Sequence, residues 1–225
     1  MTLEEAVDVR HSVRQYVDKP IEEEKRQKLN AFVDDINQES GLHIQLVYDE
    51  RKAFAGGLAS YGKFKGVSNY IALVGKKSKD LEEKIGYYGE KIVLYAKTLG
   101  LNTCWVALTF KNIKNAYQVK KGEKFLMVIS LGYGVHNGFA RKSKKGEEVS
   151  KEYETAPKWF RNGVDFALKA PTAINQQKFA ITLSEENKVK IKAIFGPYSK
   201  VDLGIVKLHF ELGAGKENFT WVDYR

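Results

Sequence analysis

Apolar residues recur along the chain with two different periods, and the two periods alternate. From Asp80 to Leu99 they return every three or four positions and Gly100 follows as a stop, which predicts a long amphipathic helix. Continuous apolar runs of strand length occur at 70–75, 104–108 and 125–132. Runs of this kind predict strands that are buried on both faces.

Shorter segments extend the same mixture of helices and strands. Thr2, with Glu5 three residues later, forms a capping box, and Pro20 with acids behind it predicts a second helix to about residue 37. Further helices are predicted over 157–169 and 201–212, and further strands over 43–48, 178–183, 189–195 and about 219–222. The glycine-punctuated segment 54–66 favours neither type.

The order of helix, polar break and alternating strand occurs twice, over 22–48 and over 157–183. A helix glycine, a second glycine eleven residues later and a Trp-Val pair also recur, beginning at Gly89 and at Gly204. These repeats predict two degenerate halves, which we place at 1–145 and 146–225. Chance similarity of two αβ units is the alternative.

Charge narrows the range of partners only slightly. The chain has 37 Lys and Arg against 28 Asp and Glu, a net charge of +9. Such an excess suits an anionic partner, whether nucleic acid, a membrane surface or a phosphate-bearing cofactor. Because basic and acidic residues are mixed along most of the chain, with the densest basic run at 141–145, a solvated surface is the simplest interpretation.

Cysteine and histidine usage excludes several kinds of site. The single cysteine, Cys104, rules out an intrachain disulfide, and the four histidines lack the close spacing that places two imidazoles on one metal. We expect no metal site and a cytoplasmic protein, since neither a leader-like start nor about 20 consecutive apolar residues is present. Cys104 lies in an apolar run and is expected in the core rather than as a nucleophile.

Arg10, Ser12 and Arg14 form the first candidate cluster for chemistry. In a helix the two arginines share a face at i,i+4, and in an extended segment all three residues share a face at period two. Two guanidinium groups beside a hydroxyl suit a phosphate, because each planar group can donate paired hydrogen bonds to its oxygens. A solvent-facing cluster is the alternative.

The second candidate is the stretch 170–177, APTAINQQ, where a predicted helix ends. Pro171 begins a rigid turn that carries the polar side chains of Thr172, Asn175 and Gln177. Amide and hydroxyl groups in such a turn can form hydrogen bonds with the polar edge of a flat heterocycle. A polar loop whose side chains satisfy its own backbone is the alternative.

Other catalytic motifs receive no support. The glycines of 132–138 superficially indicate a dinucleotide loop, but the third glycine is one place late and no helical pattern follows. The chain also lacks the sequence patterns of a serine nucleophile elbow, a P-loop or a zinc-binding HExxH helix.

Taken together, these motifs resemble the nitroreductase family of FMN-dependent oxidoreductases, in the subgroup where one chain carries both halves. Arg10-His11-Ser12-Val13-Arg14 resembles the family's Arg-x-Ser-x-Arg phosphate-binding start, and 87–106 is similar to its long core helix and the following strand. Leu131-Gly132-Tyr133 resembles the strand end before its second basic element. The stretch 170–177 resembles its small-residue turn ending in Asn-x-Gln, with Thr172 where Ser is commoner.

The resemblance implies an α+β fold with a central, mostly antiparallel sheet flanked by helices. In ordinary members the flavin lies at a dimer interface and touches one motif from each subunit. Here the first half carries the arginine motif and the second half carries the turn. We therefore expect the halves to pair as an intrachain pseudo-dimer that binds one FMN per chain, so that a monomer can be complete.

The resemblance also implies the residues of the site. The first motif, with the second basic element, is expected to hold phosphate and ribityl through Arg10, His11, Ser12, Arg14, Arg141 and Lys142. The turn is expected to cover the isoalloxazine through Pro171, Thr172, Ala173, Asn175 and Gln177. Ala107 and Leu108 would present backbone N–H groups near the redox-active edge, where family members often have a glycine or an acid.

The implied activity is electron transfer from NADH or NADPH through FMN to a small acceptor such as a nitroaromatic or a quinone, with no catalytic side chain required. A non-catalytic flavin-binding or redox-sensing protein is the first alternative, favoured by the absence of a glycine at Ala107 and Leu108. A basic RNA-binding protein is the second. It lacks a recognisable nucleic-acid module, so we expect neither a nucleic-acid nor a membrane partner.

Overall fold

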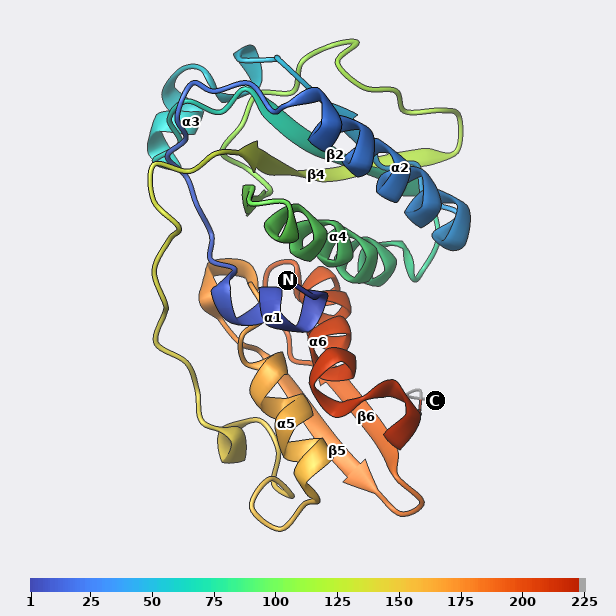
Figure 1. Ribbon diagram of the computed structural model, residues 1–225. Coiled ribbons are helices and arrows are strands. Elements are labelled where there is room, and N and C mark those ends of the chain that lie inside the picture. Colours follow the sequence, from blue (N-terminus) through green and yellow to red (C-terminus); the bar gives the residue numbers. More distant parts are fainter. Residues whose placement is uncertain (223–225) are drawn as a thin grey trace. The chain divides into compact units, whose positions relative to one another are not determined.

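The computed structural model describes residues 1–222, which divide into two compact units. Unit 1 contains Met1 and residues 9–81 and 92–140. Unit 2 contains residues 2–8, residues 82–91 and the described residues from Arg141 onward. The long helix α4 (Leu81–Thr98) contributes residues to both units (Figure 1).

Unit 1 is built on a four-stranded sheet with the order β1-β2-β4-β3, in which every neighbouring pair is antiparallel. Its strands are β1 (Gln45–Val47), β2 (Asn69–Lys76), β3 (Asn102–Val106) and β4 (Glu123–Gly132). β2 is an inner strand and is buried along nearly its whole length, which explains its continuous apolar sequence. The antiparallel sheet and the strand predictions for these apolar runs are confirmed.

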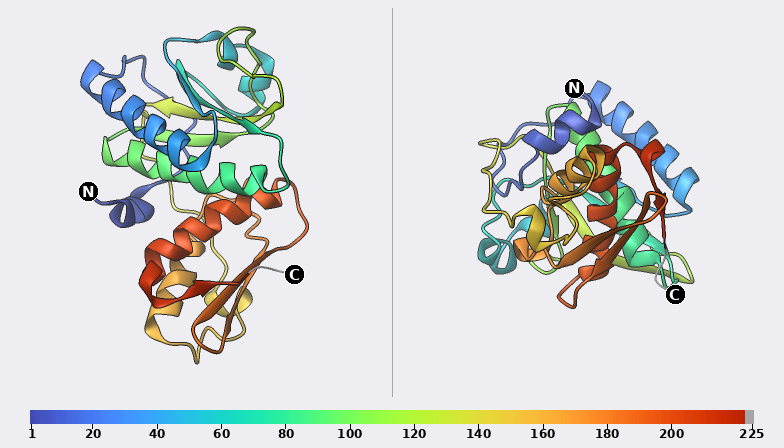
Figure 2. Two further views of the ribbon diagram at one scale, coloured as in Figure 1. Left: turned by 90° about the vertical axis from the view of Figure 1, so that its right-hand side faces the viewer. Right: turned by 90° about the horizontal axis from the view of Figure 1, so that it is seen from below.

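Helices α2 (Glu23–Ser40) and α4 pack against each other beside this sheet, as Figures 1 and 2 show. The rings of Phe32 on α2 and Tyr95 on α4 stack with centroids 4.0 Å apart. α2 begins at Glu23 rather than at Pro20, and Gly41 ends it in the left-handed conformation with φ of 71°.

A second apolar layer of unit 1 involves the segment that the sequence left unassigned. That segment contains the short helices η1 (Lys52–Phe54) and α3 (Gly57–Tyr61). Phe54 and Phe64 join Tyr70 of β2 and Val106 of β3 in one buried cluster. Cys104 is buried in the same cluster, as expected for a core residue.

Unit 2 contains a smaller sheet of β5 (Phe179–Ser184), β6 (Lys188–Ala193) and β7 (Thr220–Trp221). β5 and β6 are antiparallel, and β6 and β7 are parallel. Its helices are α5 (Lys158–Ala167) and α6 (Ser199–Ala214), which lie side by side (Figure 1), and its short helices are η2 (Gly146–Glu148), η3 (Ala173–Asn175) and η4 (Lys216–Asn218). An aromatic cluster links them, since Phe160 of α5 and Phe219 both pack edge-on against Phe210 of α6.

The first helix, α1 (Leu3–Val9), begins with the predicted capping box. The Thr2 N–H donates to Glu5 Oε2 at 2.9 Å, and the Glu5 N–H donates to Thr2 Oγ1 at 3.2 Å. Two N–H groups that the helix leaves without partners are thereby satisfied.

The same element order occurs in both parts of the chain. Leaving short helices aside, α2-β1-β2-α4-β3 corresponds to α5-β5-β6-α6-β7. In each set the first two strands are antiparallel, and the last strand runs in the direction of the second. Among the described residues, β4 has no counterpart in the second set. This correspondence supports the predicted duplication, while the pseudo-dimer itself stays a prediction.

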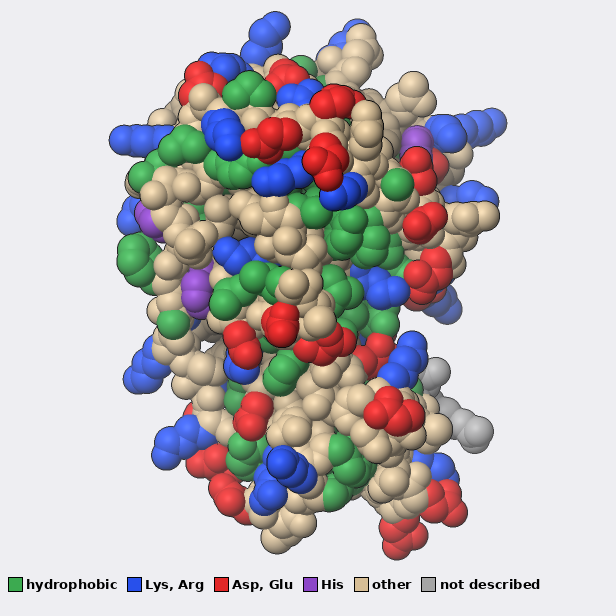
Figure 3. All heavy atoms as spheres, in the orientation of Figure 1, with side chains coloured by type: hydrophobic (Ala, Val, Ile, Leu, Met, Phe, Trp, Pro, Cys, Tyr) green, Lys and Arg blue, Asp and Glu red, His purple; other side chains and the backbone are tan. Residues whose placement is uncertain are grey.

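Two surface properties bear on partners. Over residues 1–222, no helix combines the length and apolarity needed to cross a bilayer. On the face drawn in Figure 3, Lys and Arg side chains are interspersed with Asp and Glu, as the sequence pattern indicates.

In unit 2, two glycines allow α4 and α6 to approach closely. A Cβ atom at Gly204 of α6 would lie 1.9 Å from the Glu83 carbonyl oxygen, and one at Gly86 of α4 would lie 2.0 Å from the Val201 carbonyl oxygen. Beside this contact His209 and Glu90 are fully buried, with Nε2 3.0 Å from Oε1, and His209 Nδ1 donates to the Phe166 carbonyl at 3.2 Å. The helices are therefore held by close backbone contact and by a buried polar pair.

We expect Gly204→Ala to lower the free energy of unfolding by about 1–3 kcal/mol, because the added methyl group meets backbone atoms that cannot move independently. Thermal unfolding of the purified protein measures the change. Gly57→Ala is the matched control, since Gly57 is also helical but has nothing within 4 Å of its added Cβ. Equal midpoints for both variants would contradict the close contact.

Candidate functional site

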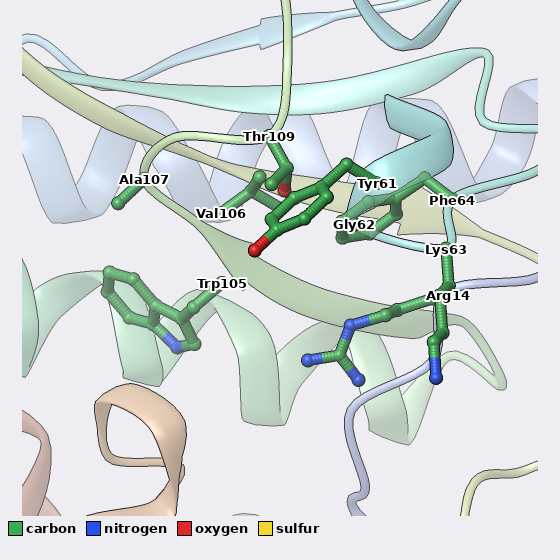
Figure 4. A pocket seen from close by; sticks show the side chains of 9 residues that line it. All are labelled: Arg14, Tyr61, Gly62, Lys63, Phe64, Trp105, Val106, Ala107 and Thr109. Atoms are coloured by element: carbon green, nitrogen blue, oxygen red, sulfur yellow. The ribbon is translucent and has the colours of Figure 1, made fainter. Parts of the chain in front are cut away.

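Unit 1 contains a pocket of about 400 Å³ at the end of β3 (Figure 4). It is lined by Arg14, Tyr61, Gly62, Lys63, Phe64, Trp105, Val106, Ala107 and Thr109. These residues come from the segment after α1, from the end of α3 and the turn behind it, and from β3 with the following loop. Two of them carry positive charge, three are aromatic and none is acidic. The pocket therefore suits a flat, electron-rich or anionic molecule.

Arg14 reaches this pocket because residues 12–17 form an extended segment, not a continuation of the helix. The Val13 N–H donates to the Thr103 carbonyl at 3.0 Å, and the Lys65 N–H donates to the Arg14 carbonyl at 3.0 Å. Val13 is fully buried, so Arg14, the next residue along the extended backbone, is directed toward the pocket (Figure 4). Of the helical and extended conformations considered for Arg10, Ser12 and Arg14, the chain thus adopts the extended one at residues 12–14.

The cationic groups of the pocket lie among aromatic rings. The Arg14 guanidinium is 5.9 Å from the centroid of the Phe64 ring. The Tyr61 side chain is 86% exposed, and its hydroxyl points into the space that Figure 4 shows between Trp105 and Arg14. Lys63 was not among the predicted site residues; a basic residue in a glycine-punctuated loop gives no signal that separates it from an ordinary surface lysine.

Ala107 and Leu108 have different surroundings. Ala107 lines the pocket, whereas Leu108 is 72% exposed and is not among the lining residues. The loop that carries them is packed closely on the end of α3, because a Cβ at Gly62 would lie 2.5 Å from Thr109 Oγ1. The structure therefore places the first of the two in the same pocket as Arg14.

Arg10 belongs to a second polar cluster of unit 1, which includes Lys97 at the end of α4. Arg10 is only 8% exposed, and burial together with the charge of Arg10 lowers the pKa of Lys97. The Lys97 ammonium and the Asn102 amide both donate to Asn137 Oδ1, each at 3.4 Å. Arg10 and Lys97 thus form a partly buried cluster of positive charge.

Ser12 and His11 lie next to this second cluster in the chain. Ser12 forms an isolated bridge with Thr103, the neighbour of Asn102. The backbone of Gly138 approaches His11, since a Cβ there would lie 2.5 Å from the His11 Cβ, and Gly138 has φ of 82°. Sequence reasoning missed Lys97 because a lysine in the last turn of a helix is ordinarily explained by the helix dipole.

In unit 2, the polar side chains of the predicted turn form hydrogen bonds with the protein. Gln177 is buried; its Oε1 accepts from the Lys144 N–H at 2.9 Å and its Nε2 donates to the Leu168 carbonyl at 2.7 Å. Thr172 Oγ1 accepts from the Gln177 N–H at 3.0 Å, and the Asn175 amide donates to the Lys142 carbonyl at 2.9 Å. These contacts fix the turn to the preceding 142–144 segment.

The remaining predicted residues of unit 2 lie around this turn. Pro171 and Ala173 are partly buried, while the side chains of Arg141 and Lys142 are exposed. The structure thus brings Lys142 beside the turn through its backbone carbonyl, and its charged group stays accessible to solvent.

Asp202, in the first turn of α6, contacts the same turn from another side and was not predicted. Its Oδ1 accepts from the Ala173 N–H at 2.9 Å, and its Oδ2 accepts from Gln176 Nε2 at 2.7 Å. Burial raises the pKa of Asp202 to about 6, although the hydrogen bonds from Gln176 and Ala173 oppose the rise.

This pKa predicts how stability changes with pH. The folded protein binds the Asp202 proton more tightly than the unfolded chain does, so the contribution of Asp202 to the free energy of unfolding is lost as pH rises through about 6. Between about pH 4 and 7, the wild type is expected to lose about 2–3 kcal/mol relative to Asp202→Asn. Denaturant unfolding across this range measures the difference, and parallel stability curves would contradict the prediction.

Among residues 1–222, no group of three or more His, Cys, Asp or Glu side chains is arranged to hold a metal ion.

Comparison with known proteins adds a family and a fold. A family model described as "Putative TM nitroreductase" matches residues 2–214. No curated protein matches the chain.

Solved structures share the fold at low sequence identity. A putative nitroreductase from Thermotoga maritima MSB8 is 24% identical and has a TM-score of 0.69, over 100% of this chain and 90% of that chain. A putative nitroreductase from Exiguobacterium sibiricum, in complex with FMN, is 16% identical with a TM-score of 0.52, over 66% and 96%. A nitroreductase family protein from Streptococcus pneumoniae is 12% identical with a TM-score of 0.52, over 66% and 98%. The α+β fold with an antiparallel sheet flanked by helices is common to them.

Proposed function

Because the chain belongs to the family described as "Putative TM nitroreductase", we propose that it is an FMN-dependent oxidoreductase. We further propose NADH or NADPH as the electron donor and a small nitroaromatic or quinone as the acceptor. The observation that carries the proposal is the pocket of unit 1, where Arg14 and Lys63 lie among aromatic rings beside the arginine motif. The Exiguobacterium sibiricum relative is described as a complex with FMN, which supports FMN as the flavin.

The residues of unit 1 fit this cofactor. FMN combines a phosphate with a flat, electron-rich ring system, and unit 1 offers a cationic cluster and a separate aromatic pocket with two cations. Arg10, Ser12 and Lys97 would hold the phosphate. Arg14, Lys63 and Trp105 would hold the ring system, with Ala107 at its edge. His11 would contribute as a neighbour of the phosphate group in the same motif.

For unit 2 we propose the role that the resemblance implies. Pro171, Thr172, Ala173, Asn175 and Gln177 would cover the ring, with Arg141 and Lys142 contributing positive charge. Because the amides of Asn175 and Gln177 already donate to the Lys142 and Leu168 carbonyls, we propose that the turn contributes mainly shape and backbone groups rather than the amide donors. On this proposal the two halves complete one site per chain, so that a monomer suffices.

The chain's own residues have defined tasks in this chemistry. When bound, FMN supplies the hydride and electron transfer, and the protein supplies binding, orientation and electrostatics. Arg14 and Lys63 would stabilise negative charge that develops on reduction, because both cations line the pocket. The exposed ring of Tyr61 would stack on a flat donor or acceptor at the pocket mouth.

A flavin-binding protein without turnover is the second candidate, favoured by one observation. Leu108 is 72% exposed and stands where related proteins often have a glycine or an acid. Steady-state oxidation of NADH and NADPH with a quinone distinguishes the two, because a redox sensor would bind flavin without sustained turnover. On the face drawn in Figure 3 the basic and acidic side chains are interspersed, and this face gives no support to RNA binding.

We expect the purified protein to contain about one FMN per chain. The visible absorption spectrum, followed by release and identification of the flavin, measures the ratio. Two per chain would contradict a single site shared by two halves. A colourless protein whose spectrum and thermal stability do not respond to added FMN would overturn the flavin proposal.

We expect Arg14→Ala to weaken FMN binding about 10–100-fold, because a charge-assisted contact worth about 1.5–3 kcal/mol is removed. Titration of the apoprotein, followed by quenching of flavin fluorescence, measures the affinity. Arg51→Ala is the matched control, since Arg51 is exposed and pairs with Asp18 away from the pocket. Equal affinities for the two variants would refute the assigned role of Arg14.

A further inference from the structure

The turn of unit 2 has an unusual backbone. Ile174, Asn175 and Gln177 all have left-handed conformations, with φ of 48°, 55° and 45°. Such conformations cost about 1–3 kcal/mol each, and Ile174 is the least suited of the three because its β-branched side chain crowds the backbone. The Ile174 side chain is nevertheless 86% exposed, so packing around it does not hold it in place.

Hydrogen bonds on both sides of Ile174 and Asn175 hold this backbone. On the C-terminal side, Gln177 is anchored to the Leu168 carbonyl and the Lys144 N–H. Asp202 contacts both sides: it accepts from the Ala173 N–H on the N-terminal side and from the side chain of Gln176 on the C-terminal side. Gln176 in turn donates to the Pro197 carbonyl at 2.9 Å, which fixes the turn to the start of α6.

The burial of the Asp202 carboxylate at these contacts costs stability. It is 6% exposed, and over residues 1–222 the recorded partners of its carboxylate are N–H groups, with no Lys or Arg paired to it. A buried carboxylate without a neighbouring cation costs stability that a neutral side chain would not. The two hydrogen bonds that Asp202 accepts from the turn are therefore better explained by the backbone geometry that they impose than by a gain in the stability of the whole protein.

We infer that Asp202 is a positioning residue, which holds the 171–177 turn in its strained conformation before the flavin binds. The inference rests on the proposed FMN function, because it assigns a purpose to the same turn. A preformed turn lowers the ordering cost of binding, so a loose turn binds the flavin more weakly without any contact to the flavin being removed. Asp202 therefore acts through the turn and need not touch the cofactor.

Hydrogen exchange in the apoprotein tests the first part. In Asp202→Asn one of the two N–H donors loses its acceptor, and in Asp202→Ala both do. We expect the Ala173 amide to exchange at least about 10-fold faster in Asp202→Ala, with an intermediate rate in Asp202→Asn. Asp165→Asn is the matched control, because Asp165 accepts from the Tyr153 hydroxyl at 2.8 Å in the same unit. Unchanged exchange at Ala173 would overturn the inference.

FMN titration and the visible spectrum test the second part. We expect the dissociation constant to rise about 3-fold in Asp202→Asn and about 10-fold or more in Asp202→Ala, with a shifted flavin absorption band and no loss in thermal midpoint for Asp202→Asn. Faster exchange with unchanged affinity and spectrum would overturn the positioning role.

A wild-type protein that does not bind FMN would refute the proposed function and, with it, the flavin part of this inference. The exchange rates would then still decide whether Asp202 holds the turn.

Discussion

The hydrogen bonds along the extended segment 12–17 hold the parts of unit 1 together around its pocket. The backbone of this segment bonds to Thr103 at the start of β3, to Lys65 behind α3 and to Tyr133 beyond β4. Tyr16 fixes the segment from inside, since its hydroxyl lies 2.8 Å from both the Val13 carbonyl and Ser130 Oγ, and burial raises the pKa of its phenol. Without these bonds Arg14 would have no fixed direction, and the loops that line the pocket would lose their common support.

The two candidate regions use polar groups in opposite ways. In unit 1, Arg14 and Lys63 line a pocket, and Arg10 lies near enough to Lys97 to lower its pKa. In unit 2, Thr172, Asn175 and Gln177 bond largely within the turn and to the segment before η2. On the proposed function, the charged residues would provide attraction, whereas the amide residues would provide shape. The stretch 170–177 can therefore be a loop whose polar side chains bond to the protein and also, on the proposed function, a turn that contacts a ligand.

The local distribution of positive charge differs from what the net charge of the chain indicates. The surplus of basic residues is spread over a mixed surface, but Arg10 and Lys97 are concentrated in one partly buried place. A net charge of +9 is compatible with several classes of partner. The pairing of Arg10 with Lys97 is more local, since burial and the charge of Arg10 together lower the pKa of Lys97.

The sequence by itself determined most of the element types outside 54–66, the buried strands, the capping box at Thr2 and the family. It could do so because periodicity reports the local backbone and the burial of each face, both of which depend on nearby residues. Only the tertiary structure decided that β4 lies between β2 and β3. It also decided that Lys97 lies near Arg10 and that Asp202 accepts a hydrogen bond from the Ala173 N–H of the turn. Each of these pairings joins residues at least 22 positions apart, and their partners are chosen by the packing of whole elements rather than by any local pattern.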